Sequence, residues 1–424
     1  MDWSKLPDIV AVALLAWAFA SVVRHNYNRV SGLWLTGWML VVLHFIAFFF
    51  LPAPRIWGLI AALVGISSLA WAGVLFMWAS VPYGVNGSSY RMLFVLLIAN
   101  SIYIYTLVVP GPRWHLDVAS VLLGLGPLAV ALRWVHKVNH VLRWVAVVLY
   151  GSLSVFLTVI QQRPDFDPNL GIDAVLFTIF FGCCVHFWYM YRHSTAGAYI
   201  TICGFFAWAA VFIVSPLQPA YFPTVKIENE VWNLPKYVVA VGMILLLLEE
   251  QIEHNKHLAL HDVLTGLPNR RLFQDRLSSA LERARRAGTH AALLVLDLDR
   301  FKQVNDTLGH HVGDLLLQRV AKVFAARVRR SDTVARTGGD EFSIILEGPT
   351  SRTEAMHVGN SLQDLLMEPL ELDGRKVKAG VSMGLAIYPD DAADTESLCI
   401  EADLRMYENK RTGARGGRSR ISAI

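Results

Sequence analysis

The first 248 residues alternate between long apolar runs and short polar breaks. A helix needs about 20 apolar residues to cross the hydrocarbon core of a bilayer, and about nine runs in this half approach or reach that length. Their approximate limits are 8–23, 31–51, 57–79, 92–109, 116–134, 141–160, 173–191, 197–215 and 235–248. The pattern predicts a polytopic, all-α membrane domain over residues 1–244, with about nine spans and a lipid bilayer around it.

The last apolar run continues into a polar stretch that keeps a helical repeat. Alternating spacings of three and four residues, typical of a coiled-coil seam, join Leu245, Leu248, Ile252, Asn255 and Ala259. The charged residues lie off this seam. Two copies could therefore pair along residues 245–260. The seam is barely two heptads long, so a single amphipathic helix that leaves the membrane is the alternative.

Composition separates the chain into two unlike halves. The 424 residues are 54% hydrophobic and 17% charged, with a formal net charge of +4. Residues 1–248 contain 21 charged side chains, whereas residues 249–424 contain 51. A single soluble domain, a disordered chain and a fibrous chain are thereby excluded. The excess positive charge lies in the apolar half, so it gives no reason to expect a nucleic acid as partner.

Residues 261–424 have the pattern of a soluble α/β domain. A helix is expected to run to about residue 287, and the apolar stretch that follows predicts a buried strand over residues 291–297, with Asp297 at its carboxyl end. Another helix is expected over about residues 312–330. Residues 333–346 predict a hairpin with Gly338 and Gly339 at its tip, where glycine permits positive φ and close approach of a ligand.

Three carboxylates are expected to meet where the strand ends. Asp297 lies at that end, and Asp340 and Glu341 lie on the hairpin tip. Crowded carboxylates repel each other and need a cation, and hard oxygen ligands select Mg²⁺ or Mn²⁺. With Lys302 and the N–H groups of the two glycines nearby, this arrangement suits a nucleoside triphosphate and phosphoryl transfer.

Five segments of the polar half together resemble the GGDEF-domain diguanylate cyclases. They are DVLTGLPNRR at 262–271, DLDRFKQVND at 297–306, GHHVGD at 309–314, RTGGDEF at 336–342 and VSMGLAIYP at 381–389. The segments follow the family's order, and the resemblance covers about residues 258–420. The membrane half resembles the multi-span sensor regions that are often joined to such domains.

The resemblance implies a reaction and its catalytic residues. The family condenses two GTP into cyclic di-GMP and two pyrophosphates, and a homodimer is required because each subunit holds one GTP. Two Mg²⁺ (or Mn²⁺) ions per active site would be held by Asp297, Asp340, the main-chain carbonyl of Leu298 and Glu341. Either Asp340 or Glu341 would accept the proton of the attacking 3′-hydroxyl.

The resemblance also implies the residues that bind GTP. Asn305 and Asp314 would bond the guanine edge, and His310 would line the same pocket. The phosphates would be held by Phe301, Lys302, Gly338, Gly339 and Lys410. The last helix departs from the family's pattern, because Ala414 takes the place of an arginine near the phosphates, a place that Arg411, Arg415 or Gly417-Arg418 would have to fill.

A second motif concerns control by the product. Arg329 and Asp332 fit the family's RxxD motif at its usual distance before the glycines, which implies an inhibitory site for cyclic di-GMP. Arginine offers a planar fork for guanine or phosphate, and aspartate can accept from guanine. The alternative is a cluster of charges that stabilises a helix C-terminus.

These observations predict a two-part molecule. The membrane domain (1–244) would be joined by the connecting helix (245–260), a potential coiled coil, to a GGDEF domain (261–424) with a mostly antiparallel sheet flanked by helices. GTP and Mg²⁺ are cytosolic, so the cyclase domain would face the cytosol from a bacterial inner membrane. The expected function is a diguanylate cyclase controlled by its membrane half and by its product. The alternative is a non-catalytic cyclic di-GMP receptor that signals by contact.

Overall fold

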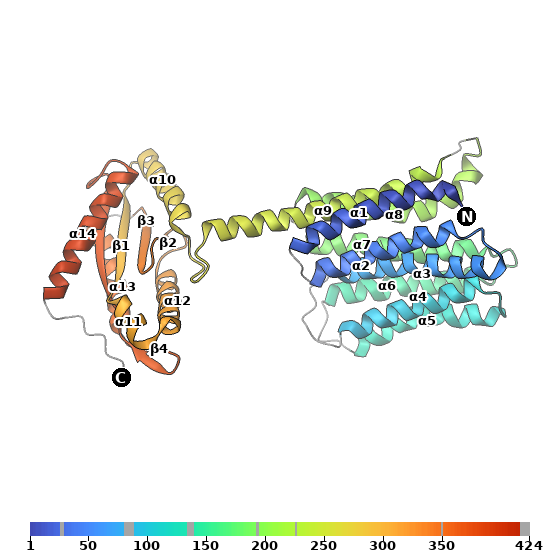
Figure 1. Ribbon diagram of the computed structural model, residues 1–424, viewed down its shortest axis with the longest axis horizontal. Coiled ribbons are helices and arrows are strands. Elements are labelled where there is room, and N and C mark those ends of the chain that lie inside the picture. The colour runs from blue at the N-terminus through green and yellow to red at the C-terminus, as the bar shows by residue number, and fades with distance from the viewer. Residues whose placement is uncertain are drawn as a thin grey trace. The chain divides into compact units, whose positions relative to one another are not determined.

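The computed structural model describes residues 1–25, 29–79, 89–133, 140–191, 195–224, 227–348 and 351–415. The chain forms two compact units, Met1–Ile252 and Glu253–Ile424 (Figure 1). The division falls inside one helix, α9, which extends from Asn229 to Leu260. The predicted connecting helix is therefore the carboxyl-terminal half of α9 and no separate element.

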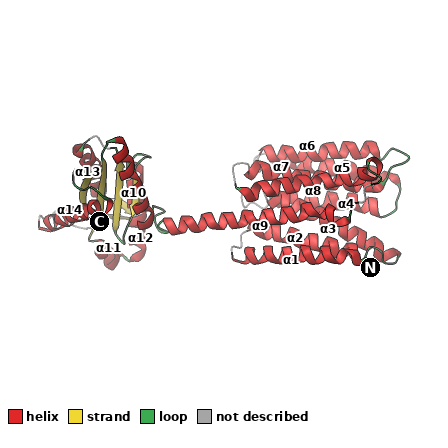
Figure 2. Ribbon diagram, turned by 90° about the horizontal axis from the view of Figure 1, so that it is seen from above, coloured by secondary structure: helices red, strands yellow, loops and turns green. Residues whose placement is uncertain are grey.

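The described part of the first unit is helical throughout. A 3-10 turn, η1 (Trp3–Lys5), precedes the helices, which lie lengthwise beside one another in a bundle (Figure 2). They are α1 (Leu6–His25), α2 (Arg29–Phe49), α3 (Arg55–Ala79), α4 (Ser89–Val108), α5 (Arg113–Arg133), α6 (His140–Ile160), α7 (Pro168–Tyr191), α8 (Ala196–Tyr221) and α9. Each apolar run in the sequence lies on one of them.

Six helices among the described residues are long and apolar enough to cross a membrane. They include Trp3–Arg24, Val30–Phe49, Arg55–Ala79, Pro168–Tyr191, Ala196–Tyr221 and Glu230–Leu260. The apolar stretches of α4 and α6, Leu93–Val108 and Trp144–Ile160, are shorter. Helix α5 carries Arg113, Asp117 and an internal Pro127. The structure thus supports about six candidate spans, fewer than the nine expected from the apolar runs.

The start of α9 is held in the bundle by polar contacts with α1. The buried carboxylate of Asp8 accepts hydrogen bonds from Asn233 Nδ2 at 2.8 Å and from the Tyr237 hydroxyl at 2.9 Å. The buried ammonium of Lys236 donates to Asn233 Oδ1 and lies 4.8 Å from the ring centroid of Phe45. Buried polar groups need such partners, so this cluster fixes which face of α9 is turned toward α1.

Helices α8 and α9 approach each other closely at glycines. A Cβ atom at Gly242 of α9 would lie 2.7 Å from the main-chain nitrogen of Thr201 of α8, and one at Gly197 of α8 would lie 2.6 Å from that of Leu246. The N–H of Gly197 donates to both carboxylate oxygens of Glu249, at 3.3 and 3.2 Å. A side chain of α9 therefore caps the first turn of α8, where main-chain N–H groups lack helical partners.

The second unit is built around a four-stranded sheet in the order β2-β3-β1-β6, in which every neighbouring pair is antiparallel. Its strands are β1 (Ala291–Asp299), β2 (Thr333–Arg336), β3 (Glu341–Glu347) and β6 (Gly380–Tyr388), and β4 (Leu370–Leu372) pairs with β5 (Arg375–Val377) separately. Its helices are α10 (Arg270–Ala287), α11 (Phe301–Leu308), α12 (His310–Arg327), α13 (Arg352–Met367) and α14 (Thr395–Arg415). The predicted antiparallel sheet flanked by helices is confirmed.

Alternation along β1 explains why helices cover both faces of this sheet. Ala292, Leu294, Leu296 and Leu298 pack in one core with α11, α12 and α13. Ala291, Leu293 and Val295 pack in the other with α10 and α14. Successive side chains of a strand point to opposite faces, so a strand that is apolar at every position becomes the buried centre of three layers.

The helix boundaries follow local signals. Helix α10 begins after Asn269, whose side chain accepts from the N–H groups of Arg271 and Leu272, and ends before Gly288 with φ 64°. This is the end that the sequence predicts. Helix α12 was expected at 312–330 but spans 310–327, because Gly309 with φ 87° ends α11 and Val328 is already extended.

Candidate functional site

Three acidic residues lie at one end of the sheet. Asp297 on β1 is directly opposite Glu341 on β3, and Asp340 comes immediately before that strand. The N–H of Leu298 donates to the main-chain carbonyl of Asp340 at 3.2 Å, which ties the end of β1 to the hairpin. Asp297 is only 7% exposed. The predicted meeting of strand end and hairpin tip is therefore present.

Lys410 of α14 supplies a positive charge at this end of the sheet. Its ammonium lies 2.6 Å from Oδ1 of Asp297, although the two residues are 113 positions apart. Burial would lower the pKa of Lys410, but the hydrogen bond and the negative charge of Asp297 outweigh burial and raise it. The ammonium is thus firmly charged and is the counter-ion of the buried carboxylate.

Among the described residues, no ion pair to either acid of the hairpin occurs, although cations further away partly offset their charge. Burial, and after it the charge of Asp297, raises the pKa of Asp340. Burial and then the charges of Asp297, Asp403 and Asp340 raise the pKa of Glu341. A raised carboxyl pKa means that the ionised form is destabilised at this position, and a bound cation would stabilise it.

The donor set fits a magnesium-like ion that binds together with phosphate. Carboxylates and a main-chain carbonyl are hard oxygen donors, and Mg²⁺ is usually held by one or two carboxylates together with substrate phosphates and water. Within the described residues, no group of three or more His, Cys, Asp or Glu side chains forms a preassembled metal cage. The site therefore suits an ion that shares its ligands with a nucleotide.

Arg336 holds the glycine-rich tip in place. Its Nε and Nη2 donate to the carbonyl of Gly339 at 3.1 and 2.7 Å, and its Nη1 donates to both carboxylate oxygens of Asp262 at 2.9 and 3.1 Å. Asp262 also accepts from the Thr265 hydroxyl at 2.6 Å. Burial would raise the pKa of Asp262, but the bonds from Thr265 and Arg336 lower it. We call this arrangement the Arg336–Asp262 latch.

The expected role of the two glycines is partly wrong. Neither Gly338 nor Gly339 belongs to the described glycines with positive φ. A Cβ atom at Gly338 would lie 2.6 Å from Oε2 of Glu341, whereas one at Gly339 would meet nothing within 4 Å. A side chain at 338 would displace the Glu341 carboxylate from its position, and at 339 the backbone stays open to a ligand.

The turn from β1 into α11 presents main-chain donors. Arg300 has φ 58°, and α11 begins directly after it with Phe301 and Lys302. The N–H groups in the first turn of a helix have no helical partner, which makes this position suitable for phosphate. Positive φ, which the sequence analysis considered for Gly338 and Gly339, is observed near this end of the sheet at Arg300 instead.

The predicted guanine residues lie on the adjacent helices α11 and α12. Asn305 of α11 has a buried Oδ1 without a hydrogen-bond partner among the described atoms, and a side chain at Gly313 would overlap that oxygen. Asp314 follows Gly313, and His310 is the first residue of α12; both are exposed. The structure thus brings Asn305 beside the segment that carries Asp314.

The RxxD motif lies in the turn between α12 and β2. The Asp332 carboxylate accepts from the N–H of Arg329 at 2.9 Å and from the N–H of Glu347 at 3.2 Å. The Arg329 side chain is 70% exposed and donates to Glu354 at 3.2 Å. Asp332 therefore stabilises the turn, while the guanidinium of Arg329 faces solvent.

Two observations concern residues outside the predicted set. Arg336 and Asp262 were assigned no role, although both lie in the segments that carry the resemblance and Arg336 stands two positions before Gly338. Ala414 and Arg415 lie on α14, but their side chains are outside the described part, as are residues 417 and 418.

The second unit is thus an α/β domain with an antiparallel sheet between helices and an acidic edge beside a glycine-rich hairpin. Residues 259–416 match the family model "Diguanylate cyclase, GGDEF domain". This part of the chain is therefore a GGDEF domain of the diguanylate cyclase family.

The chain is similar to curated proteins over about two fifths of its length. The chain is 39% identical over 194 residues to the bifunctional diguanylate cyclase/cyclic di-GMP phosphodiesterase MucR of Pseudomonas aeruginosa, covering 42% of this chain and 28% of MucR. It is 40% identical over 172 residues to the diguanylate cyclase TpbB of the same organism, covering 40% of this chain and 39% of TpbB. The chain thus spans well under half the length of these relatives. A crystal structure of the TpbB GGDEF domain is 40% identical, covers 35% of this chain and 92% of that domain, and has a TM-score of 0.35.

Proposed function

We propose that the protein is a membrane-bound diguanylate cyclase that condenses two GTP into cyclic di-GMP and two pyrophosphates. The observation that carries this proposal is the intact acidic edge of a GGDEF domain, where Asp297, Asp340 and Glu341 meet. The name of TpbB as a diguanylate cyclase supports the activity.

The acidic edge would hold two divalent ions, Mg²⁺ or Mn²⁺, through Asp297, Asp340 and the carbonyl of Leu298. When bound, such ions neutralise triphosphate charge and ease deprotonation of a hydroxyl. Glu341 is a further ligand, and Asp340 or Glu341 accepts the proton of the 3′-hydroxyl. Lys410 would leave Asp297 for a phosphate oxygen, because its charge is then needed less at the carboxylate.

GTP would lie across the ends of α11 and α12. Asn305 and Asp314 bond the guanine edge, and His310 lines that pocket. The phosphates are bound by Lys302, Lys410 and the main chain at Phe301, Gly338 and Gly339. The buried, unpartnered oxygen of Asn305 supports this assignment, because unused hydrogen-bonding capacity next to Asp314 favours a polar ligand.

The membrane half would be embedded in a bacterial inner membrane with the cyclase domain in the cytosol. Helices α4, α5 and α6 would complete nine spans, with their polar ends at the interface. GTP is found in the cytosol, so the cyclase domain would have to lie on the cytosolic side of the membrane.

Catalysis would require a homodimer, paired through the seam of α9. Leu248 and Ile252 on this seam are 37% and 53% exposed in the single chain, and Asn255 and Ala259 are exposed as well. An apolar seam of this kind favours a second copy. The membrane half would control the domains through this helix.

Product feedback would act at Arg329 and Asp332. The exposed guanidinium of Arg329 supports binding of the guanine or phosphate of cyclic di-GMP. Asp332 already accepts two main-chain bonds, so its main contribution would be to position Arg329.

The test uses purified full-length protein in nanodiscs with GTP and Mg²⁺, and measures cyclic di-GMP by mass spectrometry. We expect product from the wild type and none from Asp340→Ala/Glu341→Ala. Arg329→Ala should raise the yield late in the reaction, when product has accumulated. Absence of product together with absence of GTP binding would contradict the enzyme and favour a non-catalytic receptor.

A further inference from the structure

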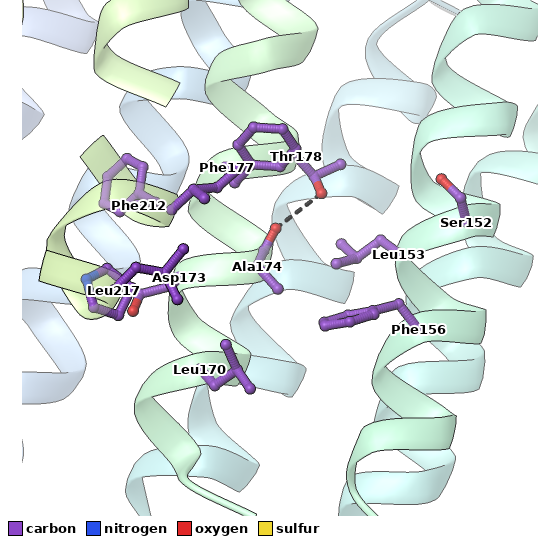
Figure 3. A pocket seen from close by; sticks show the side chains of 12 residues that line it. Ser152, Leu153, Phe156, Leu170, Asp173, Ala174, Phe177, Thr178, Phe212 and Leu217 are labelled. Atoms are coloured by element: carbon purple, nitrogen blue, oxygen red, sulfur yellow. Dashed lines mark hydrogen bonds between the residues drawn. The ribbon is translucent and has the colours of Figure 1, made fainter. Parts of the chain in front are cut away.

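A cavity of about 420 Å³ lies between α6, α7 and α8 of the bundle (Figure 3). Phe156 of α6, Phe177 of α7 and Phe212 of α8 line it, together with Asp173 of α7. The volume is in the range of small-molecule sites, which are mostly apolar with a few polar groups that orient the ligand.

Asp173 is the polar group of this cavity that retains unused binding capacity. The other polar side chains in the lining are satisfied by their own helices: Ser152 donates to the carbonyl of Val148 at 2.8 Å, and Thr178 donates to that of Ala174 at 2.8 Å. No hydrogen bond or ion pair to the Asp173 carboxyl occurs among the described residues. A carboxyl in an apolar cavity of a membrane domain is costly and is typical of a functional position.

Helix capping does not account for Asp173. Asp167 already serves the start of α7, because it accepts from the N–H of Asn169 at 2.9 Å. Asp173 lies five residues after Pro168, the first residue of the helix, so it is beyond the turn in which an acid interacts with the helix dipole. The carboxyl is therefore available for a ligand.

We propose that this cavity binds an amphiphilic organic ammonium, with the cationic group against Asp173 and the apolar body between the helices. The described lining of the cavity contains no Lys, Arg or His, so a cationic ligand would supply the counter-charge that the lining does not. Aromatic rings attract organic cations, and three phenylalanine side chains line the cavity. The ammonium could be carried by a free amphiphile or by an ethanolamine lipid.

The position of the cavity suggests how such a ligand would act, if the proposed cyclase function holds. Pro216 lies inside α8 and lines the cavity, and proline removes a helical hydrogen bond and allows bending. The same helix packs against α9 at Gly197 and Gly242. A ligand that moves α8 would therefore move the helix that leaves the bundle.

The test measures binding of decyltrimethylammonium to the full-length protein in phosphatidylglycerol nanodiscs without GTP. Decanol and decanoate are the neutral and anionic comparisons. We expect wild-type protein to prefer the cation, and Asp173→Asn to weaken its binding about tenfold or more, since a charge pair in an apolar site is strong. Asp117→Asn is the matched control, because Asp117 is a carboxylate of the membrane half that does not line the cavity.

Each outcome decides one point. Equal binding of decanol and of the cation, or unchanged binding in Asp173→Asn, would overturn the site. Weaker probe binding in phosphatidylethanolamine nanodiscs, seen in wild type but not in Asp173→Asn, would identify the lipid headgroup as occupant; equal binding in both would identify a free amphiphile. Binding without any change in cyclic di-GMP output would reject the ligand as the stimulus, and it would leave the proposed cyclase function untouched.

Discussion

The ammonium of Lys410 is paired with Asp297, and in the proposed reaction it would also bind a phosphate. We expect Lys410→Met to reduce kcat/KM for GTP about 10- to 100-fold, because a hydrogen bond to a charged group contributes roughly 1.5–3 kcal/mol. The charge of Lys410 also lowers the pKa of Asp340, so its loss should move the acidic limb of the pH–rate profile to higher pH. Lys376→Met, which changes an exposed cation on β5 outside the proposed site, is the control.

The repulsion among the acids should be visible as a stability effect. A carboxyl whose pKa is raised in the folded state keeps its proton longer when folded, so folding is less favourable once pH exceeds that pKa. Asp340→Asn should therefore raise the unfolding midpoint in EDTA at pH 7.5 by about 1–2 °C, because the group is partly exposed. The stabilisation by Mg²⁺ should shrink in the same variant. A lower midpoint in EDTA would contradict the repulsion.

Single residues were predictable where chemistry alone identifies them. Asp297, Asp340 and Glu341 are acids at the ends of recognisable strands, and the structure brings them together. The Arg336–Asp262 latch was not predictable, because its partners are 74 positions apart and the resemblance gave them no role. Positive φ was not found at Gly338 or Gly339, because a glycine can also be suited to a position by its small size.

At the scale of elements, the latch joins the segment after α9 to the hairpin tip. Arg336→Met should release Gly339 and lower kcat about tenfold or more, because catalytic groups depend on accurate positioning. Comparison with Asp262→Asn and with the double variant should give a coupling energy of about 1 kcal/mol in unfolding experiments. Additive effects of the two substitutions would show that the bond has no energetic role.

The cluster of α1 and α9 gives a second prediction at this scale. Asp8→Ala leaves the buried Lys236 without the nearby carboxylate and removes an acceptor from Asn233 and Tyr237. We expect a loss of about 1–3 kcal/mol in the membrane half, measured as a lower unfolding midpoint in detergent. Adding Lys236→Met should recover part of it. Asp165→Ala, which removes an exposed acid from the segment before α7, should have little effect.

Elements were predicted well wherever a long periodic pattern specifies them. The apolar runs, the strand at 291–297 and the hairpin all correspond to observed elements. Counting spans was harder, because helicity and the ability to cross a bilayer are different properties. Helix α5 is helical but carries charges and a proline, and α4 and α6 have short apolar stretches.

For the whole molecule, the seam of α9 should decide the oligomeric state. Ile252→Lys places a charge in the seam, and we expect it to dissociate the proposed dimer and to lower the activity at least about tenfold. His254→Lys adds the same charge off the seam and should change neither. Light scattering in detergent and the cyclic di-GMP assay check both variants. A dimeric and active Ile252→Lys protein would place the pairing elsewhere.

The latch also bears on where the chain can be divided. The end of α9 bonds to the start of α10, because Asn269 donates from its N–H to the carbonyl of Leu260 and from its side chain to that of Ala259. Two residues after α9, Asp262 accepts hydrogen bonds from Arg336, which in turn donates to Gly339 at the hairpin tip. A fragment that starts after Asp262 would keep Asp297, Asp340 and Glu341 but would lose the Arg336–Asp262 latch. Low activity of that fragment would then result from the loss of Asp262. A fragment that starts one helical turn earlier would report the activity of the intact cyclase domain.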